Sequence, residues 1–150
     1  MRFSSALALT GAALAAASPL VTKNPLEGNN FNVTNFIFGC TAGCFWYFDV
    51  SIDGSEANHP AIDTPVHCEG NLDDNKTYKP CGNVSETQHI SAYIVKDTNE
   101  LKLQYEVFNY YTAATYWYLG NTTVYAATGD NAALQKPNFR VNETSAYAVA

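Results

Sequence analysis

Basic residues are scarce in this sequence and are nowhere clustered. The chain has 8 Lys and Arg against 14 Asp and Glu, which gives a net charge of −6 at pH 7. A protein that follows a nucleic-acid strand needs a basic surface that neutralises phosphates. The composition therefore excludes nucleic acid as a partner.

Residues that commonly carry out hydrolysis are also few. Only three histidines occur, and Arg140 is the only arginine beyond Arg2, so a secreted ribonuclease's set of His, Glu and Arg is poorly supplied. The G-x-S-x-G motif of a serine nucleophile is absent. Asp49 and Asp53, opposed by Glu106, could form the paired carboxylates of a glycoside hydrolase, but 14 acids supply such sets by chance. We expect no catalytic residues, and a small secreted hydrolase is the least favoured alternative.

The spacing of common metal sites is missing as well. A blue-copper site needs a cysteine followed shortly by a histidine and an axial methionine. Cys81 has no histidine before His89, and the only methionine is Met1. Zinc ligands usually pair about two to four residues apart, whereas twelve residues separate Cys68 from Cys81. No metal and no cofactor are expected.

Long apolar runs are absent except at the N-terminus. The run Phe3 to Ala17 is rich in Ala and Leu, follows Met1-Arg2, and ends in three alanines. It is shorter than the roughly 20 residues of a membrane-spanning helix and has the form of a signal peptide. We predict a signal peptide over residues 1–17, a secreted extracellular product and no membrane partner.

Potential glycosylation sites are frequent after this segment. Five N-x-S/T acceptors have a permitted middle residue, namely Asn32, Asn75, Asn83, Asn121 and Asn142. In a secreted protein we expect several of them to carry glycans and therefore to lie at the surface. Asn121 is the strongest candidate, because Leu119-Gly120-Asn121-Thr122 is typical of an exposed turn.

Period-two alternation of apolar and polar residues dominates from Thr34 onward. It is clearest in Cys44–Asp53, and it recurs in His89–Val95 and Leu101–Asn109 on either side of a short polar turn. Weaker patterns predict strands at Phe36–Cys40, Pro65–Cys68, Ala114–Leu119, Thr122–Ala127 and Phe139–Val141, and a helical turn at Ala132–Gln135. The fold prediction is an all-β protein, a compact antiparallel β-sandwich or small β-barrel.

The same pattern divides the chain into segments. Residues 18–33 carry two prolines, four asparagines and little periodicity, and are predicted to be a flexible lead-in. Residues 34–142 are predicted to form a single β domain, and residues 143–150 a C-terminal tail. A strand beginning at Phe31 would place Asn32 on the same face as Phe36 and Phe38. Either the strand begins near Thr34 or Asn32 carries no glycan.

Four cysteines occur, and an even number in a secreted chain predicts two disulfides. Cys40 and Cys44 flank a segment of the length of a hairpin tip. Cys68 and Cys81 bracket a polar loop, whose closure stabilises a fold by roughly 3 kcal/mol on the chain-entropy model. The favoured pairs are Cys40–Cys44 and Cys68–Cys81, and the crossed pairing of Cys40 with Cys68 and Cys44 with Cys81 remains open.

The segments around these cysteines resemble the Alt a 1-like (AA1-like) family of small fungal secreted proteins. Val33–Phe36 looks like the family's opening strand and Phe45–Ile52 like its second; Val66–Cys68, a polar loop and Tyr78–Gly82 are similar to its core disulfide. The resemblance implies a small antiparallel barrel or sandwich without catalytic machinery, which acts at the host interface as an effector, elicitor or allergen-like protein. The chain has no cysteine in residues 18–39 or 82–150. A covalent dimer is therefore not implied, and we expect a monomer or non-covalent dimer.

Tyrosines are concentrated in the C-terminal half. Alternation places Tyr116 and Tyr118 on one face of a strand, and Tyr125 follows shortly. Exposed tyrosines on a sheet can stack on sugar rings or anchor a protein, although aromatic residues also stabilise strands by cross-strand packing. We take these three as a candidate binding surface. The leading hypothesis is a secreted, non-enzymatic protein that binds a host protein. The alternative is a carbohydrate-binding module that uses these tyrosines to bind a cell-wall glycan.

Overall fold

The computed structural model describes residues 29–54, 56–73 and 77–150. It is all-β, as predicted, with one 3-10 turn η1 at Ala132–Leu134, and no helix in the described ranges is long and apolar enough to cross a membrane. The eight strands are β1 Asn30–Cys40, β2 Cys44–Ile52, β3 Ile62–Asn71, β4 Lys79–Pro80, β5 Gln88–Val95, β6 Glu100–Asn109, β7 Ala114–Thr123 and β8 Phe139–Val149.

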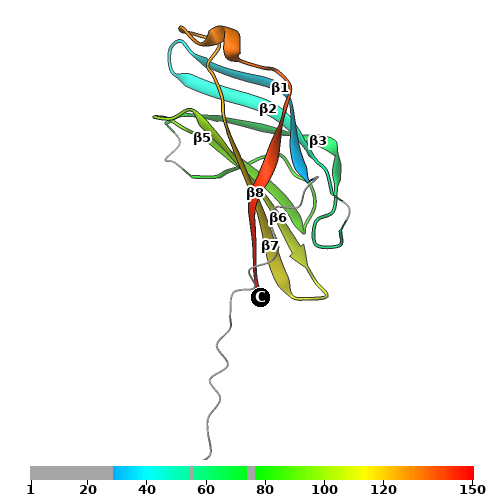
Figure 1. The fold of residues 1–150 in the computed structure, drawn as a ribbon. Helices are drawn as coiled ribbons and strands as arrows, with labels where there is room; N and C mark the ends of the chain where they lie inside the picture. The colour runs from blue at the N-terminus through cyan, green and yellow to red at the C-terminus, as the bar shows by residue number, and fades with distance from the viewer. Residues whose placement is uncertain (1–28, 55, 74–76) are drawn as a thin grey trace, which may run out of the picture.

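The strands form one antiparallel sheet in the order β3-β2-β1-β8-β7-β6-β5-β4, which curls into a nearly closed barrel (Figure 1). The two edges of the sheet meet where the Cys68–Cys81 disulfide joins β3 to the residue after β4. Beside it, the amide of Gly82 donates a hydrogen bond of 2.8 Å to the carbonyl of His67. The second disulfide, Cys40–Cys44, spans the β1–β2 hairpin tip. Both favoured pairs are confirmed, and the crossed pairing is excluded.

The alternating apolar residues fill the barrel. Trp46 and Phe48 of β2, and Leu103 and Tyr105 of β6, are all at most 2 % exposed. Large side chains buried in this way contribute about 1.5–3 kcal/mol each to folding. Strands β2, β5 and β6 lie within one residue of the predicted ranges, because apolar residues alternate regularly along most of their inward positions.

Strand β1 begins at Asn30, earlier than predicted, and a bulge resolves the conflict over its two faces. The register with β2 shifts between Thr34 and Ile37, and Asn35 has a positive φ of 53°. Such a bulge inserts one extra residue and reverses which positions face inward. Phe31 is therefore buried before the bulge and Phe36 after it. The predicted lead-in is wrong for residues 30–33, and the rest of it up to residue 28 lies outside the described residues.

The C-terminal boundaries also differ from the prediction. Residues 143–149 belong to β8, which pairs with β7 up to Thr115 and Val149, so a C-terminal tail over 143–150 is wrong. The strand was missed because Glu143 occupies an inward position and interrupts the apolar alternation. Asn121 likewise lies within β7, not in a turn, and is exposed there.

Candidate functional sites at the two ends of the barrel

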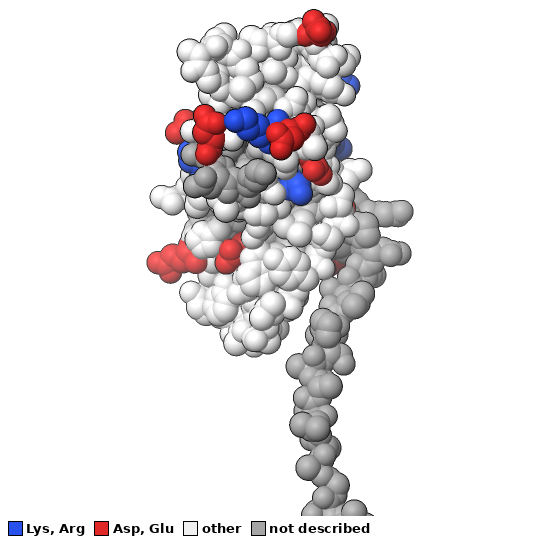
Figure 2. Space-filling view, turned by 90° about the vertical axis from the view of Figure 1, so that its left-hand side faces the viewer, with Lys and Arg blue, Asp and Glu red and all other residues white. Residues whose placement is uncertain are grey.

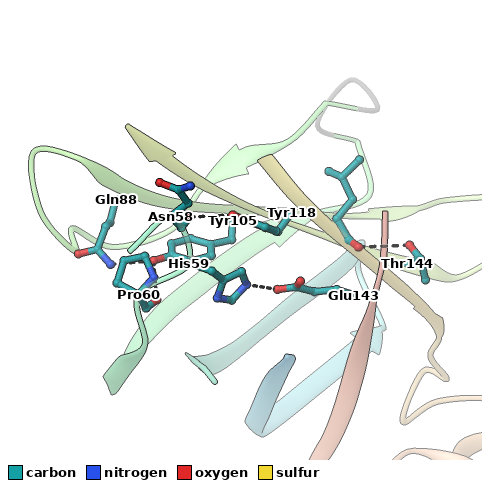
Figure 3. A network of polar contacts seen from close by, with 9 residues as sticks. Asn58, His59, Pro60, Gln88, Tyr105, Tyr118, Glu143 and Thr144 are labelled. Atoms are coloured by element: carbon teal, nitrogen blue, oxygen red, sulfur yellow. Dashed lines mark hydrogen bonds and ion pairs between the residues drawn. The ribbon is translucent and has the colours of Figure 1, made fainter. Parts of the chain in front are cut away.

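The connection from β2 to β3 enters the barrel at the end where β6 turns into β7. Its segment Asn58-His59-Pro60 lies beside the inner faces of β6 and β7 (Figure 3). His59 is fully buried, and the side-chain amide of Asn109, the last residue of β6, donates a 2.6 Å hydrogen bond to Oδ1 of Asn58. The loop therefore acts as a plug for this end.

A buried histidine–carboxylate pair holds the plug. Nε2 of His59 contacts Oε1 of Glu143, which projects from β8 (Figure 3). The Glu143 side chain is only 2 % exposed. The rings of Tyr118 and Tyr105 pack edge-on against the imidazole, with centroids at 4.2 and 5.3 Å. Polar groups buried this deeply are costly unless paired, so each partner depends on the other.

Two tyrosine hydroxyls fasten the backbone of the plug. The hydroxyl of Tyr105 donates to the carbonyl of Pro60 at 2.8 Å, and that of Tyr118 donates to the carbonyl of Asn58 at 2.7 Å. The amide of Gln88 donates in turn to the Tyr105 oxygen at 2.7 Å. Burial raises the pKa of Tyr105 to about 12, and burial raises the pKa of Tyr118 still further. Both phenols therefore stay protonated donors at neutral pH.

The remaining side of the imidazole is closed by Gly54. Nδ1 of His59 has no hydrogen-bond partner in the described part of the chain, and a Cβ built on Gly54 would lie 2.7 Å from it. A general acid or base must come within about 2.6–3.2 Å of the proton that it transfers. The His59–Glu143 pair is sealed from solvent in this structure, and it joins the plug to β8.

The β6–β7 hairpin tip lies beside the plug. Oδ1 of Asn109 accepts hydrogen bonds from the amides of Tyr111 at 2.8 Å and Thr112 at 3.4 Å, and Ala113 adopts a positive φ of 49°. The Tyr111 side chain is fully exposed, and Tyr110 is 69 % exposed with its ring edge-on to Phe108. This is a rigid turn that presents two tyrosines to solvent.

The three carboxylates considered for hydrolysis do not converge. Strands β1, β8 and β7 separate β2, which carries Asp49, from β6, which carries Glu106. Asp53 accepts a 2.7 Å hydrogen bond from Asn32. Asp49 accepts hydrogen bonds from Asn35 and from the exposed His67, which lower the pKa of this carboxyl. Asp49 and Asp53 are thus occupied by their own local partners, and Glu106 lies on β6, which three strands separate from β2.

The predicted tyrosine surface is largely internal. Alternation placed Tyr116 and Tyr118 correctly on one face of β7, but that face points into the barrel, so Tyr118 is only 6 % exposed and Tyr116 is half-buried. Tyr118 is therefore wrong as a contact residue. Tyr125 is also half-buried and lines a pocket at the opposite end of the barrel. The structure does not bring the three together on one exposed surface.

The glycosylation acceptors fall into three groups. Asn83, Asn121 and Asn142 are exposed, as attachment of a glycan requires. Asn32 is half-buried, and its Nδ2, the atom that would bear the glycan, donates to Asp53. Asn75, like the predicted signal peptide, lies outside the described residues.

Sequence reasoning missed the two central residues of the plug. His59 follows an irregular loop, and Glu143 sits within an acceptor triplet for glycosylation, so neither has a periodic signal. Elsewhere in the described ranges, no group of three or more His, Cys, Asp and Glu could hold a metal ion. Comparisons of the chain with protein-family models, with curated proteins and with solved structures find no match.

Proposed function

We propose that this is a secreted, non-enzymatic binding protein of the Alt a 1-like type, which acts by contacting a host protein. The leader-like residues 1–17 and the two disulfides support secretion, because disulfides persist in oxidising compartments. The barrel closed by Cys68–Cys81 supports kinship with a family of small disulfide-stabilised β proteins.

The observation that carries the proposal is the β6–β7 hairpin tip. Tyrosine is enriched among the residues that dominate protein interfaces, because it offers a large apolar ring and a polar hydroxyl. A contact residue held in place before binding loses less conformational entropy when the complex forms. Tyr111 meets the first condition, since its side chain is fully exposed, and the hydrogen bond from its amide to Asn109 holds the backbone of the tip.

The buried histidine supports a non-enzymatic role. His67 pairs with Asp49 at 2.9 Å on the exposed surface, whereas the His59–Glu143 pair is sealed between two tyrosines and Gly54. A substrate would reach this pair only if the plug left the barrel. The same hydrogen bonds that hold the plug therefore oppose catalysis.

Saturable binding of the fluorescently labelled protein to cells of a candidate host tests the proposal. We expect binding that unlabelled protein displaces and that Tyr111→Ala weakens at least about tenfold, as for an interface anchor. Phe45→Ala is the matched control, because Phe45 is a 46 % exposed aromatic residue on β2, outside the hairpin. Equal binding of Tyr111→Ala and the unmodified protein would remove the hairpin tip from the proposal.

Enzymatic treatment of the host cells separates the two classes of partner. Binding to a protein should disappear after protease treatment and survive glycosidase treatment. The reverse result would favour a carbohydrate-binding module over a protein-binding one. Turnover of a polymeric substrate by the purified protein, lost on His67→Ala or Asp49→Asn, would instead identify a hydrolase.

A further inference from the structure

A pocket opens at the end of the barrel opposite the hairpin tip, beneath the segment that links β7 to β8. This segment, with η1, lies at the top of Figure 1, and the β6–β7 hairpin lies at the bottom. The pocket has a volume of about 260 Å³. A cavity of about 150 Å³ holds benzene, so this one has room for a single ring with a short substituent.

The walls of the pocket are fixed by hydrogen bonds. Nε2 of Gln135 donates to the carbonyls of Phe38 at 2.7 Å and Tyr125 at 2.8 Å, which ties the segment to β1. The amide of Phe36 donates to the carbonyl of Pro137 at 2.9 Å. The pocket is thus formed by the folded chain and does not need a ligand to create it.

One part of the pocket wall is apolar and aromatic, whereas Thr122, Thr123 and two cations supply a polar part. Phe36 and Phe139 pack edge to face at 5.3 Å, and both line it together with Val124. Leu134 of η1 adds an apolar wall and is 51 % exposed. Such a surface favours the hydrophobic body of a ligand.

Two cations also line the pocket. Lys136 and Arg140 are both lining residues, whereas no Asp or Glu of the described ranges is. Among the described residues, neither cation has a carboxylate within ion-pair distance. In a chain with a net charge of −6, this local excess of positive charge is specific to the pocket.

Two other lysines, Lys96 and Lys102, differ in this respect. On the face shown in Figure 2, basic and acidic side chains lie next to one another in a band across the molecule. Lys96 pairs with Asp73 at 3.5 Å and Lys102 with Glu100 at 3.9 Å. Those positive charges are already compensated, whereas the pair at the pocket is available to a ligand.

We infer that this pocket binds a small organic carboxylate whose apolar body is about the size of one ring. The body would lie on Phe139 and Leu134, and the carboxylate would meet the guanidinium of Arg140, whose planar fork matches its two oxygens. Lys136 would add a second positive charge. The inference goes beyond the proposed function and is independent of it, because the pocket and the hairpin tip lie at opposite ends.

Titration of the ¹⁵N-labelled protein with 3-phenylpropionate, followed by NMR, tests the inference. We expect saturable shifts of the amides of Thr122–Tyr125, Leu134 and Phe139–Arg140, with a Kd of about 1 mM for a ligand this small. The matched neutral probe, 3-phenylpropan-1-ol, should bind about tenfold more weakly, because it lacks the charge-assisted contacts. Absence of saturable shifts at roughly ten times the expected Kd would overturn the inference.

Variants separate the contributions of charge and apolar surface. Arg140→Gln and Lys136→Gln should each weaken binding of the acid about five- to tenfold and leave binding of the alcohol unchanged. Leu134→Ala should weaken both probes, whereas Lys102→Gln, the matched control at a compensated lysine, should change neither. Equal affinity for acid and alcohol, shifts confined to another part of the barrel, or tighter binding of a neutral methyl glucoside would each contradict the carboxylate assignment.

Discussion

The two ends of the barrel differ in whether their charged side chains are buried and paired. At the plugged end, His59 and Glu143 are buried against one another and their side chains are at most 2 % exposed. Two tyrosine rings pack against the imidazole. At the open end, Lys136 and Arg140 border an apolar pocket and face no carboxylate among the described residues. Charged side chains thus serve stability at one end, and at the other they lie beside a pocket without a carboxylate partner in the described ranges.

This difference has a physical basis. A buried polar group is costly unless its partner is in place, so the plugged end depends on the contact between His59 and Glu143. An exposed cation is hydrated by water at little cost, and hence a fold can leave it unpaired. Substitutions at the plugged end should therefore alter the free energy of unfolding, and those at the open end should alter binding.

The largest effect is expected from His59→Ala. Removing the imidazole leaves the buried Glu143 without its partner and opens a cavity, which should lower the free energy of unfolding by about 3–5 kcal/mol. Urea denaturation measures the change. His67→Ala is the matched control, because His67 also pairs with a carboxylate but its side chain is 53 % exposed; we expect a change within about 0.5 kcal/mol. Similar losses in the two variants would show that burial does not distinguish the two pairs.

A smaller loss is expected from Gly54→Ala, because the new methyl group would collide with the plug. Its Cβ would lie 2.3 Å from the carbonyl oxygen of His59, and backbone atoms cannot rotate away. We expect a loss of about 1–3 kcal/mol, with the NMR signals of Asn58–Pro60 displaced. At the open end, Gly129→Ala meets no atom within 4 Å but has a φ of +97°, so it should cost only about 1 kcal/mol. A larger loss at Gly129 would reverse the contrast between the ends.

Tyr118→Phe should cost about 1 kcal/mol, because the carbonyl of Asn58 loses its hydrogen-bond donor. Denaturation at neutral pH measures this loss. Tyr111→Phe is the control, since the side chain of Tyr111 is fully exposed and its hydroxyl faces water. No difference between these two variants would mean that water replaces the donor at Asn58.

The same tyrosines predict a loss of stability in alkali. Burial raises the pKa of Tyr105 to about 12 and also raises that of Tyr118. The folded state therefore holds these protons more tightly than the unfolded chain, whose tyrosines have a pKa of about 10. The resulting stability is fully present below about pH 10 and is lost as the pH rises towards about 12. Urea midpoints measured across this range should fall less steeply for Tyr118→Phe; an unchanged slope would assign the loss to other groups.

The smallest effect is expected at the open end. The double variant Lys136→Gln/Arg140→Gln should change the free energy of unfolding by less than about 0.5 kcal/mol, as is usual for exposed positions. Thermal and urea denaturation would measure it. A loss above about 1 kcal/mol would mean that the cations hold the fold, and the contrast with the plugged end would disappear.

The alternation of apolar and polar residues predicted the positions of some strands but not of others. Strands β2, β5 and β6 alternate without interruption, so their positions follow from the pattern alone. The bulge at Asn35 and the inward Glu143 break that pattern, and the ends of β1 and β8 were accordingly misplaced. Both disulfides agree with the pairs favoured from loop lengths. Cys40 and Cys44, for example, lie opposite one another across the tip of the β1–β2 hairpin.

The candidate sites depended far more on the tertiary structure. Alternation puts Tyr116 and Tyr118 on one face but cannot tell which face of the sheet is inside when both carry aromatic residues. His59 acquires its partner from a strand 84 residues further along the chain. The pocket likewise combines Phe36 of β1 with residues 122–140.

By itself, the sequence determined the all-β class, the presence of two disulfides, the acidic charge and the scarcity of catalytic residues, because these follow from composition and from periodicity between near neighbours. Only the tertiary structure decided which end of the barrel is sealed and which is open. That decision rests on contacts between residues far apart in the chain, where closure of the sheet brings His59 to Glu143 and leaves Lys136 and Arg140 beside an apolar pocket without an acid.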